Sequence, residues 1–176
     1  MRKTVLFIAM SLDGYIADEQ GGVSWINGQG DPEDMIDVYS SFVKNVDTIF
    51  VGWNTYHQVV TELSPEEWVY QDFTTYVFTH KQQLSSPQIR FTGENPVDML
   101  KRLKEEKGKD IWICGGADLI GQLMQDDCID EYYLSVIPVL LGKGIRLFGN
   151  FEKEKKLKLC KVQSYNGITD LVYTRR

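Results

Sequence analysis

Two adjacent glycines, Gly115 and Gly116, separate a short apolar run from a segment with helical spacing. The run over residues 111–114 predicts a buried strand, and the apolar positions after the glycines predict a helix that reaches Gln125. Glycine allows close approach of a ligand, and the free N–H groups and dipole of a helix amino end attract anions. The junction therefore indicates a phosphate site, although a tight strand-to-helix turn without a ligand uses the same residues.

Two other predicted strands end in a glycine or a polar residue, Gly52 and Thr79. The strand over residues 48–51 runs into Gly52, with Asn54 or Thr55 as the cap of a short helix, and a further strand covers residues 75–79. Ligands of α/β sheets bind beyond the carboxyl ends of the strands. We therefore expect the three junctions to meet at one edge and to form a single ligand site.

A candidate carboxylate lies between the first two strands. Asp31 and Pro32 are typical of a helix start, and Asp34 would lie one turn into that helix at the edge of its apolar face. Such a carboxylate either faces solvent and favours the helix dipole or acts as a proton source, and both interpretations stay open. Residues 18–30, rich in glycine, predict a long loop of the kind that often covers a site.

The complete pattern predicts one α/β domain over residues 1–176. Asn95-Pro96 starts a helix that Gly108 ends, and Asn166-Gly167 is a strong hairpin signal. The order of elements implies a single, mostly parallel mixed sheet flanked by helices, with a carboxy-terminal antiparallel hairpin. The other predicted strands cover residues 4–10, 89–92, 131–139, 157–164 and 169–175.

Composition and charge exclude several classes of function. The net charge of -6 argues against nucleic-acid binding, which depends on clustered Lys and Arg. No apolar stretch approaches the roughly 20 residues that span a bilayer, so we expect no membrane partner. Three cysteines fit neither a disulfide framework nor a zinc pattern, and only two histidines are present. We expect a cytoplasmic protein without a metal that acts on a small-molecule substrate.

Four segments carry a pattern that extends over nearly the whole chain. They are Ser11-Leu12-Asp13-Gly14-Tyr15-Ile16-Ala17, Val51-Gly52-x-x-Thr55-Tyr56, Ile113-Cys114-Gly115-Gly116, and Pro138-Val139-Leu140-Leu141-Gly142-Lys143-Gly144 followed by Leu147-Phe148. In this order and spacing the chain resembles the dihydrofolate reductase fold. Within that fold it resembles most the RibD C-terminal reductase group of riboflavin biosynthesis and its stand-alone relatives.

The resemblance implies that NADPH lies across the sheet edge, with NADH as the alternative. It implies that the substrate pocket is lined by Ser135, Met35 and Val38, although Ser135 is equally interpreted as a buried hydroxyl bonded to its own backbone. It also implies a carboxylic acid as proton source, for which we choose Asp34 over Asp31 and Asp37. The residues implied to bind the cofactor are Ala9, Ile16, Gly52, Trp53, Thr55, Thr79, His80, Gly115, Gly116, Ala117 and Leu119.

Two positions depart from the family pattern. Trp53 stands where the family commonly has an arginine at the adenosine phosphate, which weakens the preference for NADPH over NADH unless His80 or Lys81 compensates. Ile120 stands where dihydrofolate reductases have a tyrosine.

The predicted function is an NADPH-dependent reductase of a pyrimidine or pteridine-type heterocycle, closest to 5-amino-6-(5-phosphoribosylamino)uracil reductase. The alternatives are a dihydrofolate reductase and a nucleotide-binding protein of the same fold without turnover.

An apolar set in the strand over residues 131–139 bears on assembly. Tyr132, Tyr133, Val136 and Ile137 would form either a self-complementary face that supports a homodimer or part of the core.

Overall fold

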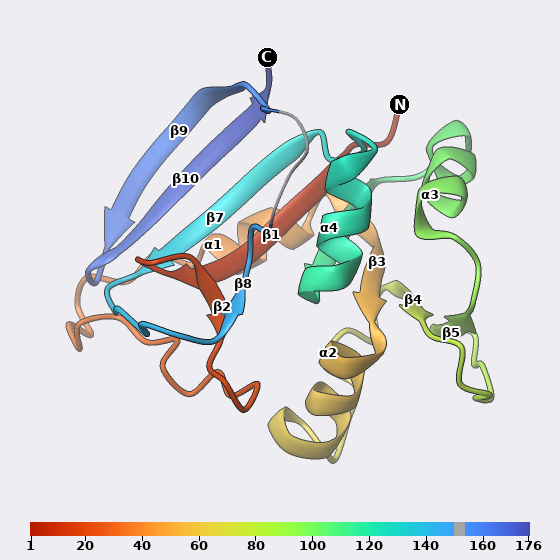
Figure 1. Cartoon of the computed structure of the whole chain (residues 1–176), viewed down its shortest axis with the longest axis horizontal. Helices are drawn as coiled ribbons and strands as arrows, with labels where there is room; N and C mark the ends of the chain where they lie inside the picture. Colours follow the sequence, from red (N-terminus) through yellow and green to blue (C-terminus); the bar gives the residue numbers. More distant parts are fainter. Residues whose placement is uncertain (150–153) are drawn as a thin grey trace.

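An eight-stranded sheet forms the centre of the molecule, and the computed structural model describes residues 1–149 and 154–176. Its strands are Thr4–Ser11 (β1), Val46–Gly52 (β3), Thr74–Phe78 (β4), Ile89–Thr92 (β5), Asp110–Gly115 (β6), Glu131–Ile137 (β7), Leu157–Tyr165 (β9) and Ile168–Arg175 (β10). They are ordered β5-β4-β3-β6-β1-β7-β10-β9 (Figure 1). The strands from β5 to β7 are parallel, whereas β10 and β9 are antiparallel to their neighbours. The predicted sheet and its antiparallel carboxy-terminal hairpin are confirmed.

Helices cover both faces of this sheet. They are α1 (Val38–Val43), α2 (Trp53–Gln58) with its π-helical continuation η1 (Val59–Leu63), α3 (Pro96–Glu105) and α4 (Ala117–Gln125). Figure 1 shows α3 and α4 in front of the sheet, where Leu100 and Ile120 belong to one core cluster, and α1 behind it. On that far face Phe42 of α1 stacks on Phe7 of β1, with ring centroids 4.3 Å apart. No helix in the described part of the chain is long and apolar enough to cross a membrane.

The prediction of a helix that begins at Asp31 is wrong. Helix α1 begins at Val38, with Asp37 as its N-cap. The backbone N–H of Asp31 donates instead to Oδ1 of Asn166 at 2.8 Å, and the carboxylate of Asp34 accepts from the Asn166 amide at 2.6 Å. These long-range bonds hold the segment before α1 as an irregular strap across the hairpin turn, and the Asp31 carboxylate caps only a local turn by accepting from the Glu33 amide at 3.1 Å.

Local signals elsewhere predicted the element ends with mixed success. The Asn95 side chain caps α3 as predicted, because its Oδ1 accepts from the Val97 amide at 2.9 Å. The turn between β9 and β10 is also as predicted: Asn166 and Gly167 have φ values of 45° and 75°, the positive values of a tight hairpin. The cap predicted for α2 is wrong, since that helix begins at Trp53 after Gly52 and no side chain among the described residues caps it.

A two-stranded antiparallel sheet of β2 (Tyr15–Ala17) and β8 (Ile145–Arg146) was not predicted. Strands of three and two residues are too short to produce a recognisable period. The pair fastens the segment after β1 to the chain near Gly144, whose Cβ position would lie 2.2 Å from the carbonyl oxygen of Ala17.

The turn between β1 and β2 is fixed by the carboxylate of Asp13. It accepts hydrogen bonds from the Ser11 hydroxyl at 2.6 Å and from the Gly142 and Leu141 amides at 2.7 and 3.1 Å. The bond from Ser11, aided by the two amides, lowers the pKa of Asp13 from 3.8 to about 2. Only the ionised carboxylate of Asp13 accepts all of these bonds, so folding favours the ionised form. Its contribution to stability is therefore complete above the ordinary pKa of 3.8, and it is lost as the pH falls through the folded-state pKa of about 2.

We therefore expect the thermal stability of the wild-type protein to fall between about pH 4 and about pH 2 more steeply than that of the Asp13→Asn variant. The measurement is the melting temperature across this pH range. Parallel curves for the two proteins would show that Asp13 does not couple folding to acid.

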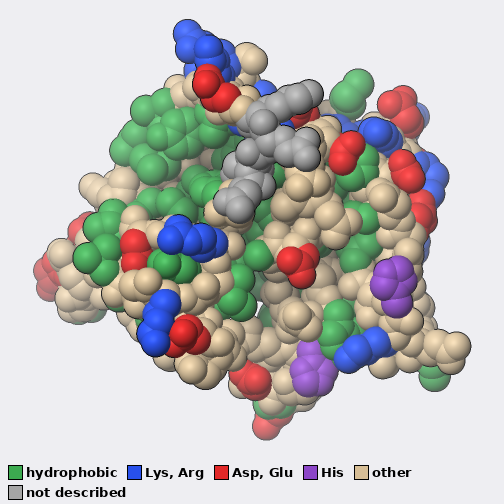
Figure 2. Space-filling view, viewed as in Figure 1, with side chains coloured by type: hydrophobic (Ala, Val, Ile, Leu, Met, Phe, Trp, Pro, Cys, Tyr) green, Lys and Arg blue, Asp and Glu red, His purple; other side chains and the backbone are tan. Residues whose placement is uncertain are grey.

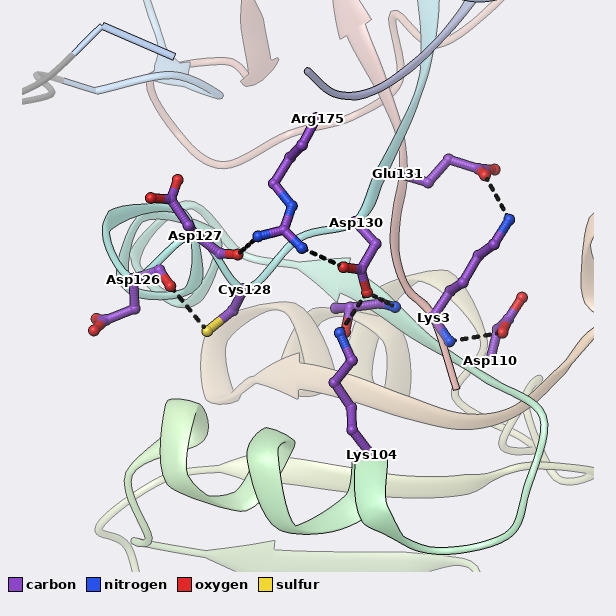
Figure 3. A network of polar contacts seen from close by, with 10 residues as sticks. Lys3, Lys104, Asp110, Asp126, Asp127, Cys128, Asp130, Glu131 and Arg175 are labelled. Carbon is purple, nitrogen blue, oxygen red and sulfur yellow. Dashed lines mark hydrogen bonds and ion pairs between the residues drawn. The ribbon is translucent and has the colours of Figure 1, made fainter. Parts of the chain in front are cut away.

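A second polar cluster joins four elements at the amino-terminal edge of the sheet. Figure 3 shows Lys104 of α3 and Arg175 of β10 pointing at the carboxylate of Asp130, which precedes β7. Asp130 also accepts from the Thr4 amide of β1 at 2.9 Å. Burial alone would raise the pKa of Asp130, but the hydrogen bonds from Lys104 and Thr4 outweigh it and hold that pKa below its ordinary value.

Strand β7 does not present the predicted self-complementary face. Tyr132 and Ile137 are 2% and 1% exposed within the single chain. Successive side chains of a strand point to opposite faces, so Tyr133 and Val136 lie on different sides of the sheet. The four residues therefore form no shared surface, and homodimerisation stays a prediction that needs other residues.

Candidate functional site

A cleft of about 830 Å³ opens at the carboxyl ends of β1, β3 and β6. Its walls come from these strand ends, from α2 and η1, from the first turn of α4 and from the loop after β2. The predicted convergence is present for the junctions after β3 and β6, because parallel strands end at the same edge of a sheet. The third junction is not part of it, since Phe78 of β4 lines the cleft but Thr79 does not. A smaller hollow of about 290 Å³ lies at the opposite end of the strands, beside Lys3 and Val46, and contains none of the glycine junctions.

The glycine junctions after β3 and β6 approach each other in this cleft. A Cβ atom at Gly52 would lie 3.4 Å from the amide nitrogen of Gly116, and one at Gly116 would lie 3.1 Å from Oγ1 of Thr55. Gly115 has φ of 142°, and the peptide bond that joins it to Gly116 is cis. Within the described parts of the chain, no side chain caps the amino end of α4. The helix start, Thr55 and the two glycine turns together form a cradle suited to an anion.

Most of the residues predicted to bind the cofactor are brought together here. Leu119 is not among them, because its side chain is 4% exposed and packs in the core under α4. Thr79 and His80 lie outside the cleft and line a separate hollow of about 330 Å³ at the ends of β4 and β5. The predicted residues that do line the cleft are Ala9, Ile16, Gly52, Trp53, Thr55, Gly115, Gly116 and Ala117.

Lys81 links the cleft and the smaller hollow. Its Nζ lies 4.5 Å from the centroid of the Trp53 ring, a cation–π distance. Among the described residues that line the two cavities, Lys81 is the only lysine or arginine. An anion at this outer end of the cleft would therefore have Lys81 as its counter-charge.

The cleft itself is acidic. Glu19, Glu62 and Asp118 line it, from the loop, from η1 and from the first turn of α4. Figure 2 shows acidic side chains over the start of α4 and at the lower edge of the molecule near the end of α2. The charge of the cleft is thus opposite to that of a typical phosphate pocket.

The inner part of the cleft is apolar and uncharged. Cys114 and Tyr70 lie there with Ile8, Ala9 and Ile16. Burial raises the pKa of the Cys114 thiol to about 12 and also raises the pKa of Tyr70 above its ordinary value. Both side chains are therefore neutral near pH 7, and this region offers a bound ring an environment of low polarity.

The loop predicted over residues 18–30 is present and forms one wall. The carboxylate of Asp18 accepts from the amides of Gln20 and Gly22 at 2.9 and 2.7 Å, so the turn is held from within. Across the cleft, Nε2 of Gln58 in α2 donates to the carbonyl oxygen of Gly21 at 2.8 Å. This bond latches the loop to α2 and closes one side of the cleft.

Loss of this latch should open the loop more often without unfolding the protein. We expect Gln58→Ala to speed hydrogen exchange at the amides of residues 20–22 by roughly fivefold, the effect of losing a bond that contributes about 1 kcal/mol. Gln122→Ala, an exposed glutamine on α4, is the matched control and should leave that exchange unchanged. Equal exchange in the Gln58 variant and wild type would mean that the loop is fixed by other contacts.

The residues predicted to bind and protonate the substrate lie away from the cleft. Asp34 accepts from the Asn166 amide, and the sulfur of Met35 lies 3.3 Å from Nδ2 of Asn166. Val38 lines the hollow at the opposite end of the strands. Asp34 as a proton source stays a prediction, whereas its observed contact fastens the strap to the hairpin.

Ser135 belongs to a buried polar cluster that sequence analysis missed. It pairs in register with Ala9, and its hydroxyl donates to Asp170 of β10 at 2.7 Å rather than to its own backbone. Asp170 is 0% exposed and also accepts from Tyr133 at 3.0 Å and Gln163 at 2.8 Å. Burial and the Asp170 carboxylate together raise the pKa of Tyr133. Aspartate is usually exposed in proteins, and the bonds from Tyr133 and Ser135 to Asp170 span 37 and 35 positions of the chain, so no local signal would have found the cluster.

Comparison with known proteins supports one family. The model of the RibD C-terminal domain family matches residues 2–173 of the chain. The uncharacterised protein YwjB of Bacillus subtilis (strain 168) is 42% identical over 180 residues, which cover 99% of this chain and 98% of that protein. A putative riboflavin biosynthesis protein from Shewanella sp. PV-4 has a similar structure, with a TM-score of 0.86, 27% identity and 99% coverage of both chains.

Two further solved structures support the fold. A diaminohydroxyphosphoribosylaminopyrimidine deaminase/5-amino-6-(5-phosphoribosylamino)uracil reductase from Thermotoga maritima has a TM-score of 0.70 and 16% identity, covering 99% of this chain and 57% of that one. A dihydrofolate reductase from Enterococcus faecalis, complexed with NADP(H), has a TM-score of 0.64 and 16% identity, covering 99% and 96% of the two chains. The fold is therefore dihydrofolate reductase-like.

Proposed function

Because the chain belongs to the RibD C-terminal domain family, whose fold and relatives are those of reductases, we propose that it is an NADPH-dependent reductase of a pyrimidine or pteridine-type heterocycle. The observation that carries the proposal is the cradle formed by Gly52, Thr55, Gly116 and the uncapped start of α4. Its glycines leave the space that a pyrophosphate needs, and a Cβ atom at Gly116 would intrude on it. The residues present therefore fit a dinucleotide.

Each wall of the cleft then has a role in the reaction. Bound NADPH would supply the hydride. The start of α4 and Thr55 hold the phosphates, and Trp53 provides a ring face for stacking at the outer end. Ala9 and Ile16 position the reactive ring against the apolar inner cleft, where the neutral side chains of Cys114 and Tyr70 lie. The loop held by Gln58 excludes water from the side that it covers.

The test is a titration of the protein with NADPH and, separately, with NADH, followed by tryptophan fluorescence. Trp53 lies in the cleft wall under Lys81, and a ring stacked on it should change its emission. We expect saturable binding of NADPH. With Lys81→Gln we expect NADPH affinity to fall by roughly tenfold and NADH affinity to change little, because only NADPH carries the extra phosphate.

The matched control is Lys107→Gln, which removes a lysine from the connection between α3 and β6 without touching either cavity. If neither nucleotide binds to the folded protein, the proposed function is wrong. Binding of NADPH without reduction of any pteridine or pyrimidine would favour the alternative of a nucleotide-binding protein without turnover.

A further inference from the structure

The cleft carries negative charge, and no lysine or arginine among the described residues lines it. Glu62 of η1 lines the cleft, and its carboxylate makes no hydrogen bond or ion pair with any residue in the described parts of the chain. Glu19 lines the opposing loop and is paired at 2.8 Å with Lys143, which does not line the cleft. The glycine cradle and Lys81 are the groups suited to phosphate, and the cofactor of the proposed function occupies both.

The acidic character continues outward from Glu62. Directly after η1, Glu66 and Glu67 line a shallow hollow with Ser64 and Pro65. Both glutamates are exposed, and neither side chain has a hydrogen-bond or ion-pair partner among the described residues. A substrate tail that leaves the cleft on this side would therefore meet three unpaired carboxylates.

From this charge distribution we propose that the substrate carries no phosphate and no carboxylate, and is a neutral or cationic heterocycle. The inference rests on the proposed function for the identity of the ring. A phosphorylated tail requires Arg, Lys or a set of free backbone amides, and a like charge beside Glu62 would oppose its binding. The same reasoning applies to the glutamate tail of dihydrofolate. The apolar inner wall and neutral Cys114 and Tyr70 accept an uncharged ring without such a cost.

The experiment uses substrate pairs that differ in their charged tail. The first pair is 5-amino-6-(5-phosphoribosylamino)uracil and the same compound after removal of its phosphate. The second is dihydrofolate and a dihydropterin without the aminobenzoyl-glutamate tail. Dissociation constants are measured by tryptophan fluorescence, with and without saturating NADP⁺, and turnover by the oxidation of NADPH. We expect the uncharged member of at least the first pair to bind about tenfold more tightly and to be favoured by a similar factor in kcat/KM.

A charge-reversal variant tests the cause. Glu62→Lys should narrow or invert the preference within each pair, because it places a cation where the tail leaves the cleft. Glu105→Lys makes the same charge change at an exposed end of α3, away from the cleft, and should leave the preference unchanged.

Equal or tighter binding of the phosphorylated member overturns the inference, and so does binding of neither member of either pair. The separate titration with NADPH distinguishes these results from failure of the proposed function. If NADPH fails to bind, the reductase assignment is wrong, and the fluorescence affinities for the pairs still decide the charge of the preferred ligand.

Discussion

Replacing Gly116 with valine is expected to weaken NADPH binding by at least roughly a hundredfold, or about 2.7 kcal/mol, while the protein still folds. The Cβ atom would lie 3.1 Å from Oγ1 of Thr55, and the two methyl groups would extend into the cradle. The backbone at Gly116 has φ of -93°, which any residue adopts. The substitution therefore acts by filling the anion site rather than by straining the chain.

The measurement is the NADPH dissociation constant, with circular dichroism and thermal melting to establish that the variant is folded. Gly121→Val is the matched control, because Gly121 lies in the same helix and a Cβ atom there meets nothing within 4 Å. That control should bind NADPH as the wild type does. Unchanged affinity in folded Gly116→Val would mean that the double glycine serves only as a tight turn, the alternative that its sequence pattern left open.

The second large effect is expected at Asn166, on which the strap before α1 depends. Asn166 is 8% exposed, and its side chain accepts from the Asp31 amide at 2.8 Å. The backbone carbonyl oxygen of Asn166 accepts from the backbone amide of Gln29 at 2.8 Å, and the backbone amide of Asn166 donates to the Asp34 carboxylate. Asn166→Ala removes the side-chain acceptor and places alanine at φ of 45°. We expect the free energy of unfolding to fall by about 3 kcal/mol, the sum of a lost buried hydrogen bond and a left-handed alanine.

Urea denaturation of the wild type and two variants separates these contributions. Asn166→Gly keeps the backbone bonds and tolerates positive φ, so we expect it to lose only about 1 to 2 kcal/mol. An Asn166→Ala variant as stable as the wild type would show that the strap is held elsewhere. Equal losses in the two variants would assign the whole effect to the side-chain hydrogen bonds and none to the backbone conformation.

The parts of this fold that sequence patterns predicted are those with local causes. An apolar run of strand-forming residues, as at Val51 or Ile113, needs a buried sheet wherever it lies in the chain. The Asn166-Gly167 pair favours a tight turn through its own φ preferences, and Asn95 caps α3 through residues two and three positions away. Glycines at the ends of β3 and β6 predicted the cleft for a similar reason, because parallel strands bring their carboxyl ends to one edge.

The errors share a different cause, which is competition from residues far along the chain. Asp31 and Pro32 have a good local pattern for a helix start, yet Asn166, more than 130 positions later, takes the Asp31 amide and the Asp34 carboxylate. Aspartate is a residue type that is mostly exposed, yet Tyr133, Ser135 and Gln163 donate to the buried carboxylate of Asp170. In both places a long-range hydrogen bond outweighs a local preference of about 1 kcal/mol.

The cleft also combines features with local causes and features that depend on residues far apart in the chain. Each glycine turn is followed directly in the chain by a helix start, as at Gly116 and α4, so a local pattern was sufficient to predict where these groups meet at the sheet edge. The anion site itself stays a prediction. The acidic lining comes from Glu19, Glu62 and Asp118, which lie on three separate elements and form no pattern in the sequence. Only folding brings their carboxylates to one cavity and leaves Lys81 as the cation at its outer end. Local preferences thus account for the elements and their turns, whereas the charge of the cleft depends on side chains that are distant along the chain and meet only in the tertiary structure.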